Sequence, residues 1–158
     1  FRREIATNRG VMMEHKSRNH LYVDVENNSG LKPDYLHKFL HGTIFHRKLA
    51  VISENTTHSL EKLWSNEIHQ YEIKSAGSDK NAADYKLIYE IMKQHRIDCN
   101  LGYTPSKIYI ITRDSDFTDL TYMLVQLGYE VHILGYGDIS LKLEKVATSC
   151  TNLREVLA

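Results

Sequence analysis

The chain has few of the residues that impose a covalent or conformational framework: of its 158 residues, two are cysteines, two are prolines and one is a tryptophan. Cys99 and Cys150 fit neither a disulfide framework nor the spacing of a metal-binding cluster. No apolar run approaches the roughly 20 residues of a membrane span, and the N-terminus lacks the hydrophobic region of a signal peptide. We therefore expect a cytoplasmic protein with reduced thiols and no membrane partner.

The chain also lacks an excess of charge of either sign. Lys plus Arg and Asp plus Glu number 20 each, so a nucleic acid would be bound by a local basic patch and not by the overall charge. The length and a hydrophobic content of 42% are enough for one domain with its own core. We expect this domain over residues 20–158 and a leader or arm over residues 1–19.

Segments with the pattern of strands alternate with segments with the pattern of helices. Short runs of apolar and β-branched residues predict strands, and apolar residues at helical spacing predict helices. The expected strands are residues 20–25, 48–53, 71–74, 108–112 and 130–134, and the expected helices are residues 33–41, 59–68, 81–96, 117–127 and 140–147. Residues 152–157 are expected to form a last short strand or helix. This alternation predicts an α/β fold with a mainly parallel sheet, right-handed crossovers and helices on both faces.

Acidic residues follow two of the expected strands and begin one of the expected helices. Asp24 stands at the end of the first strand, Asp114 and Asp116 follow the strand at 108–112, and Asp84 lies in the first turn of the helix at 81–96. Because ligands of open parallel sheets gather at the carboxyl ends of the strands, we expect these four side chains at one edge. Turn and helix-cap roles are the alternative for each of them taken alone.

Four carboxylates at one edge would repel one another unless a cation lies among them. Hard oxygen ligands suit Mg²⁺ or Mn²⁺, which keep several waters and also bind the oxygens of substrate phosphates. A metal ion in such a site polarises a phosphodiester and lowers the pKa of an attacking water. The four aspartates therefore predict a metal site and the hydrolysis of phosphodiester bonds.

Three segments carry a resemblance to a known family: VDVEN at 23–27, KNAADYKLIYEI at 80–91 and ITRDSDFTDLTYMLVQLGYEVHILG at 111–135. In their order and separation they resemble the signature segments of NYN domains, a PIN-like nuclease group that includes LabA-like proteins. The resemblance implies a PIN-like three-layer sandwich around a mainly parallel sheet. It also implies an endoribonuclease that requires Mg²⁺ or Mn²⁺, with RNA as its partner.

Carried over by position, the resemblance assigns one catalytic and metal-binding role to the four acidic residues Asp24, Asp84, Asp114 and Asp116. It makes Asn27 their polar partner in the first motif. Three further candidates for substrate contact or support of the site are Lys80, Thr112 and Ser115. Lys80 would touch the scissile phosphate, with a solvated lysine as the alternative. For the two hydroxyl residues we favour hydrogen bonds to the backbone over orientation of the carboxylates.

The chain departs from the family pattern at two positions. Many relatives have a small residue where Arg113 stands, and often an aspartate where Glu90 stands. Glu90 follows Asp84 by nearly two helical turns, so its part in the site stays open, as does that of Glu26. For Arg113, a pair with Asp114, a contact to a phosphate and a surface position are the alternatives.

Two other functions fit part of the sequence. A catalytically inactive RNA-binding or protein-interaction module would keep the fold and the acidic edge without turnover. A Toprim-type catalytic domain would pair Glu26 with Asp114 and Asp116, but this interpretation leaves Asp24 and Asp84 without a role. The sequence names neither the RNA nor the oligomeric state, and it leaves open a homodimer or further domains in a longer chain.

Overall fold

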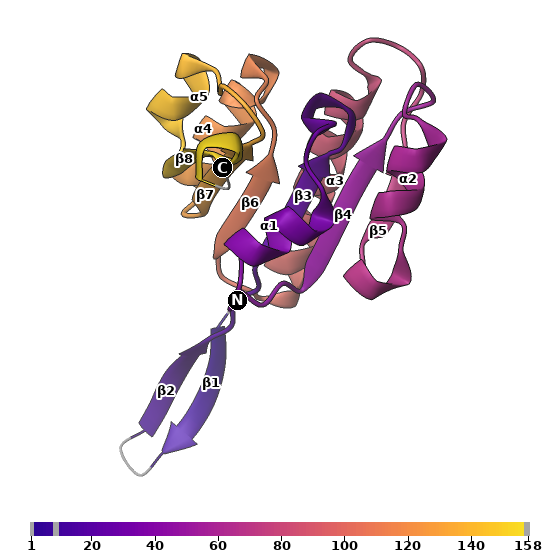
Figure 1. The fold of residues 1–158 in the computed structure, drawn as a ribbon. Coiled ribbons are helices and arrows are strands. Elements are labelled where there is room, and N and C mark those ends of the chain that lie inside the picture. The colour runs from indigo at the N-terminus through magenta and orange to yellow at the C-terminus, as the bar shows by residue number, and fades with distance from the viewer. Residues whose placement is uncertain (1, 8–9, 157–158) are drawn as a thin grey trace.

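The centre of the molecule is a six-stranded sheet in which every neighbouring pair of strands is parallel (Figure 1). The computed structural model describes residues 2–7 and 10–156. The strands are β3 (His20–Asp24), β4 (Arg47–Ile52), β5 (Glu72–Ser75), β6 (Lys107–Ile111), β7 (Glu130–Gly135) and β8 (Ser149–Asn152). Their order across the sheet is β5-β4-β3-β6-β7-β8. The predicted parallel α/β architecture is confirmed.

The two central strands, β3 and β6, are made of the apolar runs that the sequence marks as buried strands. All five residues of β3 are buried. Tyr22 belongs to the core on one face of the sheet, whereas Leu21 and Val23 belong to the core on the other. Successive side chains of a strand point to opposite faces, so an uninterrupted apolar run is what a strand covered on both faces requires.

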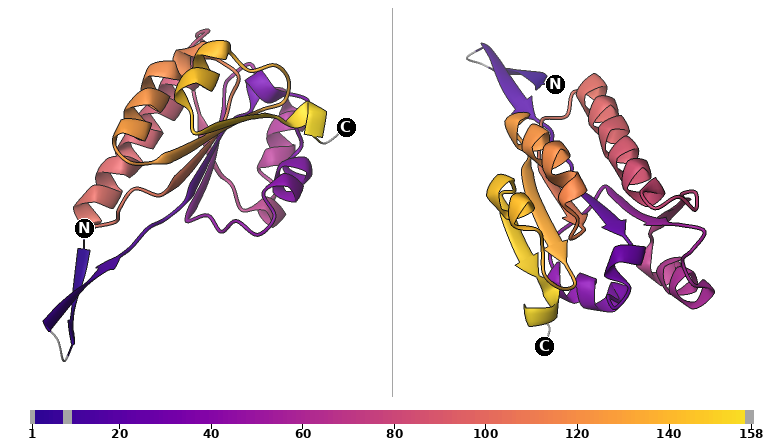
Figure 2. Two further views of the ribbon diagram at one scale, coloured as in Figure 1. Left: turned by 90° about the vertical axis from the view of Figure 1, so that its left-hand side faces the viewer. Right: turned by 90° about the horizontal axis from the view of Figure 1, so that it is seen from above.

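Helices cover both faces of the sheet and complete three layers (Figure 2). The first face packs against α3 (Ala82–Leu101), α4 (Thr118–Gln126) and α5 (Leu141–Val146), and the second against α1 (Pro33–Phe39), α2 (His58–Trp64) and α6 (Leu153–Val156). Leu87, Leu124 and Leu143 contribute to the core under the first group. Leu36 and Trp64 contribute to the core under the second. Both cores hold β3 and β6 in the middle of the molecule.

The structure corrects two of the expected boundaries. Helix α3 continues to Leu101, beyond the expected end at residue 96, and Gly102 ends it with φ of 88°. Its added turn is held by Asp98, which accepts hydrogen bonds from His20 in β3 and from Gln94. Helix α2 ends at Trp64, short of the expected end at residue 68. Strand β8 was not expected, whereas α6 lies within residues 152–157, where a last short strand or helix was expected. The end of α3 and the formation of β8 beside β7 depend on tertiary contacts, which a local pattern does not contain.

Three short 3₁₀ helices complete the described chain: η1 (Glu26–Asn28), η2 (Glu67–His69) and η3 (Ser115–Phe117). Helices η1 and η3 lie directly after β3 and β6, at the carboxyl ends of these strands. None of the helices in the part of the chain that the structure describes is long and apolar enough to cross a membrane. Cys99 and Cys150 are free thiols, as expected.

An antiparallel hairpin of β1 (Arg2–Thr7) and β2 (Gly10–His15) precedes the sheet and extends away from it (Figure 1). It forms a separate two-stranded sheet. The chain joins the body of the domain at Lys16, whose carbonyl accepts hydrogen bonds from the backbone N–H and the hydroxyl of Thr104. Asn19 then accepts hydrogen bonds from Ser106 and Lys107. The division into an arm at 1–19 and a domain at 20–158 remains a prediction, and residues 1, 8–9 and 157–158 lie outside the described part.

Candidate metal centre

The candidate site lies where the strand order changes direction. From β3 the chain moves outward to β4 and β5, and it then returns to the other side of β3 to form β6, β7 and β8. The loops after β3 and β6 therefore diverge, which is the position at which open parallel sheets bind ligands. Asp24 is the last residue of β3, and Asp114 caps η3 three residues after β6. Asp84 reaches this edge from the first turn of α3.

Three of the four predicted aspartates form a cluster of the size of a metal site. Carboxylate oxygens of Asp84, Asp114 and Asp116 all lie within 4.8 Å of one another. Asp84 is buried, Asp114 is half-buried and Asp116 is exposed, so the cluster runs from the interior to the surface. Asp24 stands outside this group of three but is close enough for its charge to raise the pKa of Asp84.

Asp24 is fully buried, and only one of its two carboxylate oxygens has a hydrogen-bond partner among the described residues. Its Oδ2 accepts a hydrogen bond of 2.6 Å from Nδ2 of Asn27, the polar partner expected from the sequence. Its Oδ1 is buried and has no hydrogen-bond partner within the described residues. Burial raises the pKa of Asp24 to about 6, and the charges of Glu26 and Asp114 act in the same direction while the bonds from Asn27 oppose them. A buried acceptor without a donor is costly, and a cation would satisfy it.

Asp84 is the aspartate most affected by its neighbours. Burial, together with the charges of Asp24 and Asp114, raises the pKa of its carboxyl group to about 7. Near neutral pH the site therefore holds a proton where it would otherwise concentrate negative charge. A divalent cation with oxygen ligands removes the same repulsion, so the residues present fit Mg²⁺ or Mn²⁺.

The turn that carries Asp114 and Asp116 is fixed by its own hydrogen bonds. Asp114 Oδ1 accepts a bond of 2.9 Å from the backbone N–H of Asp116. The buried hydroxyl of Thr112 accepts a bond from the backbone N–H of Asp114, which confirms the backbone contact favoured for Thr112. Ser115 is exposed, and its carbonyl accepts a bond of 2.6 Å from Thr118. Lys80 is exposed in the turn before α3.

Asn28 is a structural residue of the site that the sequence analysis missed. Its buried side chain donates to the carbonyls of Asp24 and Ile111, at the ends of β3 and β6. Its Oδ1 accepts a bond of 3.0 Å from the backbone N–H of Tyr136, directly after β7. One amide thus joins the ends of three strands. The only signal in the sequence is its place in a polar turn after a strand that ends in aspartate.

Arg113 borders the acidic cluster without pairing with Asp114 among the described residues. Its Nε and Nη2 donate to the carbonyl of Asn27, at 3.3 and 3.2 Å. A side chain at Gly135 would collide with Cγ of Arg113, and one at Gly137 would collide with its guanidinium. A pocket of about 250 Å³ is lined by Asn27, Arg113, Asp114 and Asp138, so a cationic group faces the same opening as the acidic turn.

The two glutamates whose roles the sequence left open lie outside the cluster. Glu90 is buried and pairs with Arg47 at 2.7 Å. Arg47 begins β4, so this ion pair is near the opposite end of the sheet from the aspartates. Glu26 Oε2 accepts a hydrogen bond from the hydroxyl of Ser53. These contacts assign Glu90 to the structure of the domain and turn Glu26 toward β4.

Comparison with known proteins identifies the class to which this fold and site belong. The model of the NYN domain matches residues 18–154, so the chain belongs to the NYN family. NYN domains are nuclease-like and share the PIN-like fold, and nucleases of the family generally use divalent metal ions. The match confirms the resemblance carried by the three sequence segments.

A solved structure shows the same fold in a distant protein. The crystal structure of a protein of unknown function from Vibrio parahaemolyticus superposes with a TM-score of 0.69 and 15% sequence identity. The superposition covers 89% of this chain and 95% of the other. At this identity the likeness concerns the fold alone. No curated protein gives a significant sequence match.

Proposed function

We propose that this NYN domain is an Mg²⁺- or Mn²⁺-dependent endoribonuclease that hydrolyses phosphodiester bonds at the acidic edge of its sheet. The observation that carries the proposal is the convergence of Asp84, Asp114 and Asp116 within 4.8 Å, beside the unsatisfied Oδ1 of the buried Asp24. These residues would hold the metal ion. When bound, it would polarise the phosphodiester and lower the pKa of the attacking water.

The residues of the chain have distinct parts in this proposal. Asp24, fixed by Asn27, presents its free oxygen from the interior, and Asp114 is oriented by the backbone N–H of Asp116. Because these bonds fix the carboxylates before ligands arrive, little reorganisation is needed when the metal and the phosphate enter. Asp84 would give up its proton when it holds the cation, because the cation would then neutralise the charge that the proton neutralises near pH 7.

The position of Asp84 favours this function over a Toprim-type site. A Toprim interpretation pairs Glu26 with Asp114 and Asp116, whereas here Glu26 binds Ser53 and Asp84 joins the two aspartates of the turn. The family match agrees with this choice. An inactive RNA-binding module of the same fold is the remaining alternative, and it predicts binding without turnover.

Cleavage of an end-labelled single-stranded RNA tests the proposal. We expect the wild type to cut within the RNA in Mg²⁺ or Mn²⁺ and to stop in excess chelator. Loss of an outer partner of a metal ligand already costs about 10- to 100-fold, so Asp114→Asn should lower the rate at least about 100-fold. Asp119→Asn, an identical change at an exposed position in the first turn of α4, should leave it unchanged. RNA binding without cleavage by the wild type would instead identify the inactive module.

A further inference from the structure

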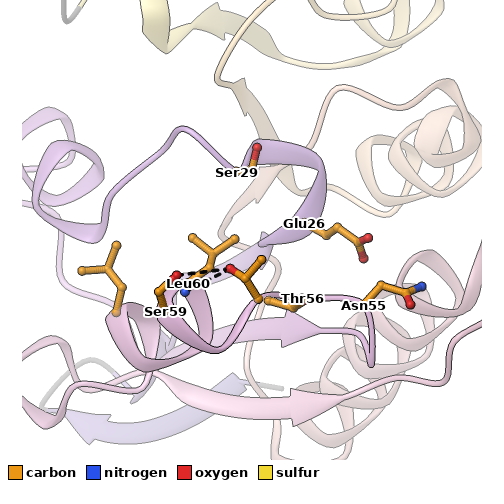
Figure 3. Close-up of a pocket in the computed structure, with 8 residues that line it drawn as sticks. Glu26, Ser29, Asn55, Thr56, Ser59 and Leu60 are labelled. Carbon is orange, nitrogen blue, oxygen red and sulfur yellow. Dashed lines mark hydrogen bonds between the residues drawn. The ribbon is translucent and has the colours of Figure 1, made fainter.

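A second pocket opens beside the acidic site, between η1 and the segment that joins β4 to α2 (Figure 3). It has a volume of about 410 Å³, which is within the range of small-molecule sites. Glu26 and Ser29 line it from the loop after β3, and Asn55 lines it from the loop after β4. Both loops follow the carboxyl ends of their strands, so the pocket and the aspartates share one edge of the sheet.

Glu26 lines the pocket from the loop that follows Asp24. It follows Asp24 by two residues, and its charge contributes to the raised pKa of Asp24. Its carboxylate is oriented by the buried Ser53, which donates to Oε2 and accepts a bond of 3.2 Å from the backbone N–H of Asn55. Figure 3 shows the side chains of Glu26 and Asn55 close together at one end of the pocket.

The rest of the lining is uncharged and combines polar groups with an apolar wall. Hydroxyl groups come from Ser29, Thr56, Thr57 and Ser59, and the apolar wall from Leu60 and Leu63. Thr57 is partly engaged, because its Oγ1 caps α2 by accepting a bond from the backbone N–H of Leu60. The pocket thus offers one carboxylate, one amide and several hydroxyl groups next to a surface on which a flat ring can lie.

This chemistry restricts the ligand. A phosphate or another anion would be repelled by Glu26. A wholly apolar ligand would leave the carboxylate and the hydroxyl groups desolvated and without partners. A planar group that carries N–H donors satisfies both walls, with its face on the leucines and its edge on Glu26. Nucleobases of single-stranded RNA are recognised in this way, through hydrogen bonds on their Watson–Crick edges.

We propose that the pocket lined by Glu26, Asn55 and Leu60 binds a base of the RNA strand that flanks the scissile phosphate, and that this base is guanine. Guanine is the only common base with two adjacent N–H groups, N1–H and the N2 amino group, on its Watson–Crick edge. A carboxylate only accepts hydrogen bonds and therefore pairs with that edge. The identity of the strand as RNA rests on the function proposed above, whereas the preference for the base does not depend on cleavage.

A binding measurement tests the preference separately from catalysis. Labelled oligouridines that contain one central guanosine, inosine or adenosine are titrated in Mg²⁺ with the Asp114→Asn protein, and fluorescence anisotropy is recorded. Because a well-placed base contact discriminates by about tenfold or more, guanosine should bind about tenfold more tightly than adenosine. Inosine lacks the N2 amino group and should lie between them.

The added change Glu26→Gln should reduce the preference for guanosine over adenosine to less than about twofold. The matched control is Glu54→Gln, at an exposed glutamate in the same loop as Asn55, and it should keep the full preference. Equal affinity for the guanosine and adenosine oligonucleotides, no measurable binding of either, or an unchanged preference after Glu26→Gln would overturn the inference.

A second variant tests the pocket while it keeps the hydrogen bond between Ser53 and Glu26. Ser59→Phe places a ring in the pocket from an exposed position of α2, and it should also abolish the preference while circular dichroism stays that of the folded protein. A preference that survives this change would place the base elsewhere. Cleavage by the wild type without any guanosine preference would leave the nuclease proposal intact and reject this one, whereas guanosine-selective binding without cleavage would do the reverse.

Discussion

At the scale of single residues, the site contains buried carboxylates that receive too few hydrogen bonds to offset their burial. Asp24 and Asp84 have pKa values raised to about 6 and about 7, mainly because they are buried. Such groups resist ionisation, so a bound cation would compete with protons for the same oxygens near neutral pH. The acidic edge is consequently less stable when it is ionised and empty than when it is protonated or occupied.

Asp84→Asn is expected to stabilise the metal-free protein in a pH-dependent manner. The folded pKa of Asp84 is above the ordinary value of 3.8, so the folded state keeps a proton that the unfolded state has released. Its contribution to the free energy of unfolding therefore falls as the pH rises from about 4 to 7 and is constant above that. In chelator, the melting temperature of Asp84→Asn should exceed that of the wild type at pH 8, and the excess should shrink as the pH falls toward about 4.

Thermal melts of both proteins between pH 5 and pH 8 measure this difference. Asp79→Asn, at an exposed position in the turn before α3, is the matched control and should follow the wild type. A difference between Asp84→Asn and the wild type that does not change over this interval would contradict the raised pKa. Mg²⁺ should raise the melting temperature of the wild type more than that of Asp84→Asn, because a ligand of the folded state stabilises it.

Gly135 supports the position of Arg113 by having no side chain. A Cβ atom at Gly135 would lie 2.5 Å from Cγ of Arg113 and 3.1 Å from the carbonyl oxygen of Thr112. We expect Gly135→Ala to lower the free energy of unfolding by about 1–3 kcal/mol, as overpacking does, and to weaken RNA cleavage through displacement of Arg113. Urea denaturation measures the first effect. Gly77→Ala, where the nearest atom is 3.9 Å away, should cost less than about 0.5 kcal/mol, and an equal loss in both variants would contradict the argument.

At the scale of elements, the site depends on how the ends of β3, β6 and β7 are held together. Asn28 performs this role from η1, with bonds to the carbonyls of Asp24 and Ile111 and from the backbone N–H of Tyr136. The strands bring Asp24 and Asp114 to one edge, and this amide fixes their spacing. Loops that carry functional groups need such support because they are otherwise the mobile parts of a fold.

Asn28→Ala removes three hydrogen bonds and leaves two carbonyls and one N–H of the backbone without this partner. We expect a loss of about 2–4 kcal/mol in the free energy of unfolding, because unsatisfied buried polar groups cost more than the bonds themselves. The fraction of nuclease activity that is lost should be larger than the fraction of protein that is unfolded, because the folded protein also loses the spacing of its aspartates. Chemical denaturation and RNA cleavage below the melting temperature measure the two effects. Asn100→Ala, at an exposed position near the end of α3, should change neither, and normal stability of Asn28→Ala would refute the role.

The helices and strands differ in how well the local sequence predicts them. Strand β3 is predictable because a run of apolar residues needs burial on both faces. Strand β8, with the sequence SCTN, has no apolar pattern and forms through its pairing with β7. The acidic residues of the site could be found because they follow strands or begin a helix, whereas the bridging bonds of Asn28 span up to 108 positions of the chain. Local sequence indicates which residues end a strand, but not which distant atoms their neighbours reach.

At the scale of the whole molecule, the N-terminal hairpin and the six-stranded sheet are two separate sheets. Strands β1 and β2 pair with each other, outside the six-stranded sheet. Residues 16–19 instead bind the body of the domain, through the Lys16 carbonyl and the side chain of Asn19. The family match begins at residue 18, within this connecting segment. We therefore expect the acidic site to keep its geometry in a chain that starts at residue 16.

Removal of residues 1–15 should change the free energy of unfolding by less than about 0.5 kcal/mol. The melting temperature should therefore stay within about 2 °C of that of the full chain. Removal of residues 1–19 also deletes the bonds of Lys16 and Asn19 to the segment 104–107, and should cost about 2–3 kcal/mol. Calorimetry of the two truncated proteins compares these outcomes. Equal stability of both would place the boundary of the domain at residue 20, and a large loss in the shorter truncation would show that the hairpin supports the fold.

The central claim is that aspartates from three separate elements form one metal centre. Anomalous diffraction from a crystal of the wild-type protein soaked in Mn²⁺ tests it most directly. We predict a peak at the acidic edge, roughly 2 Å from carboxylate oxygens of Asp84 and Asp114 and beside Asp24. Absence of a peak there, with Mn²⁺ bound elsewhere or with Asp24 and Asp114 too far apart to share an ion, would contradict the account.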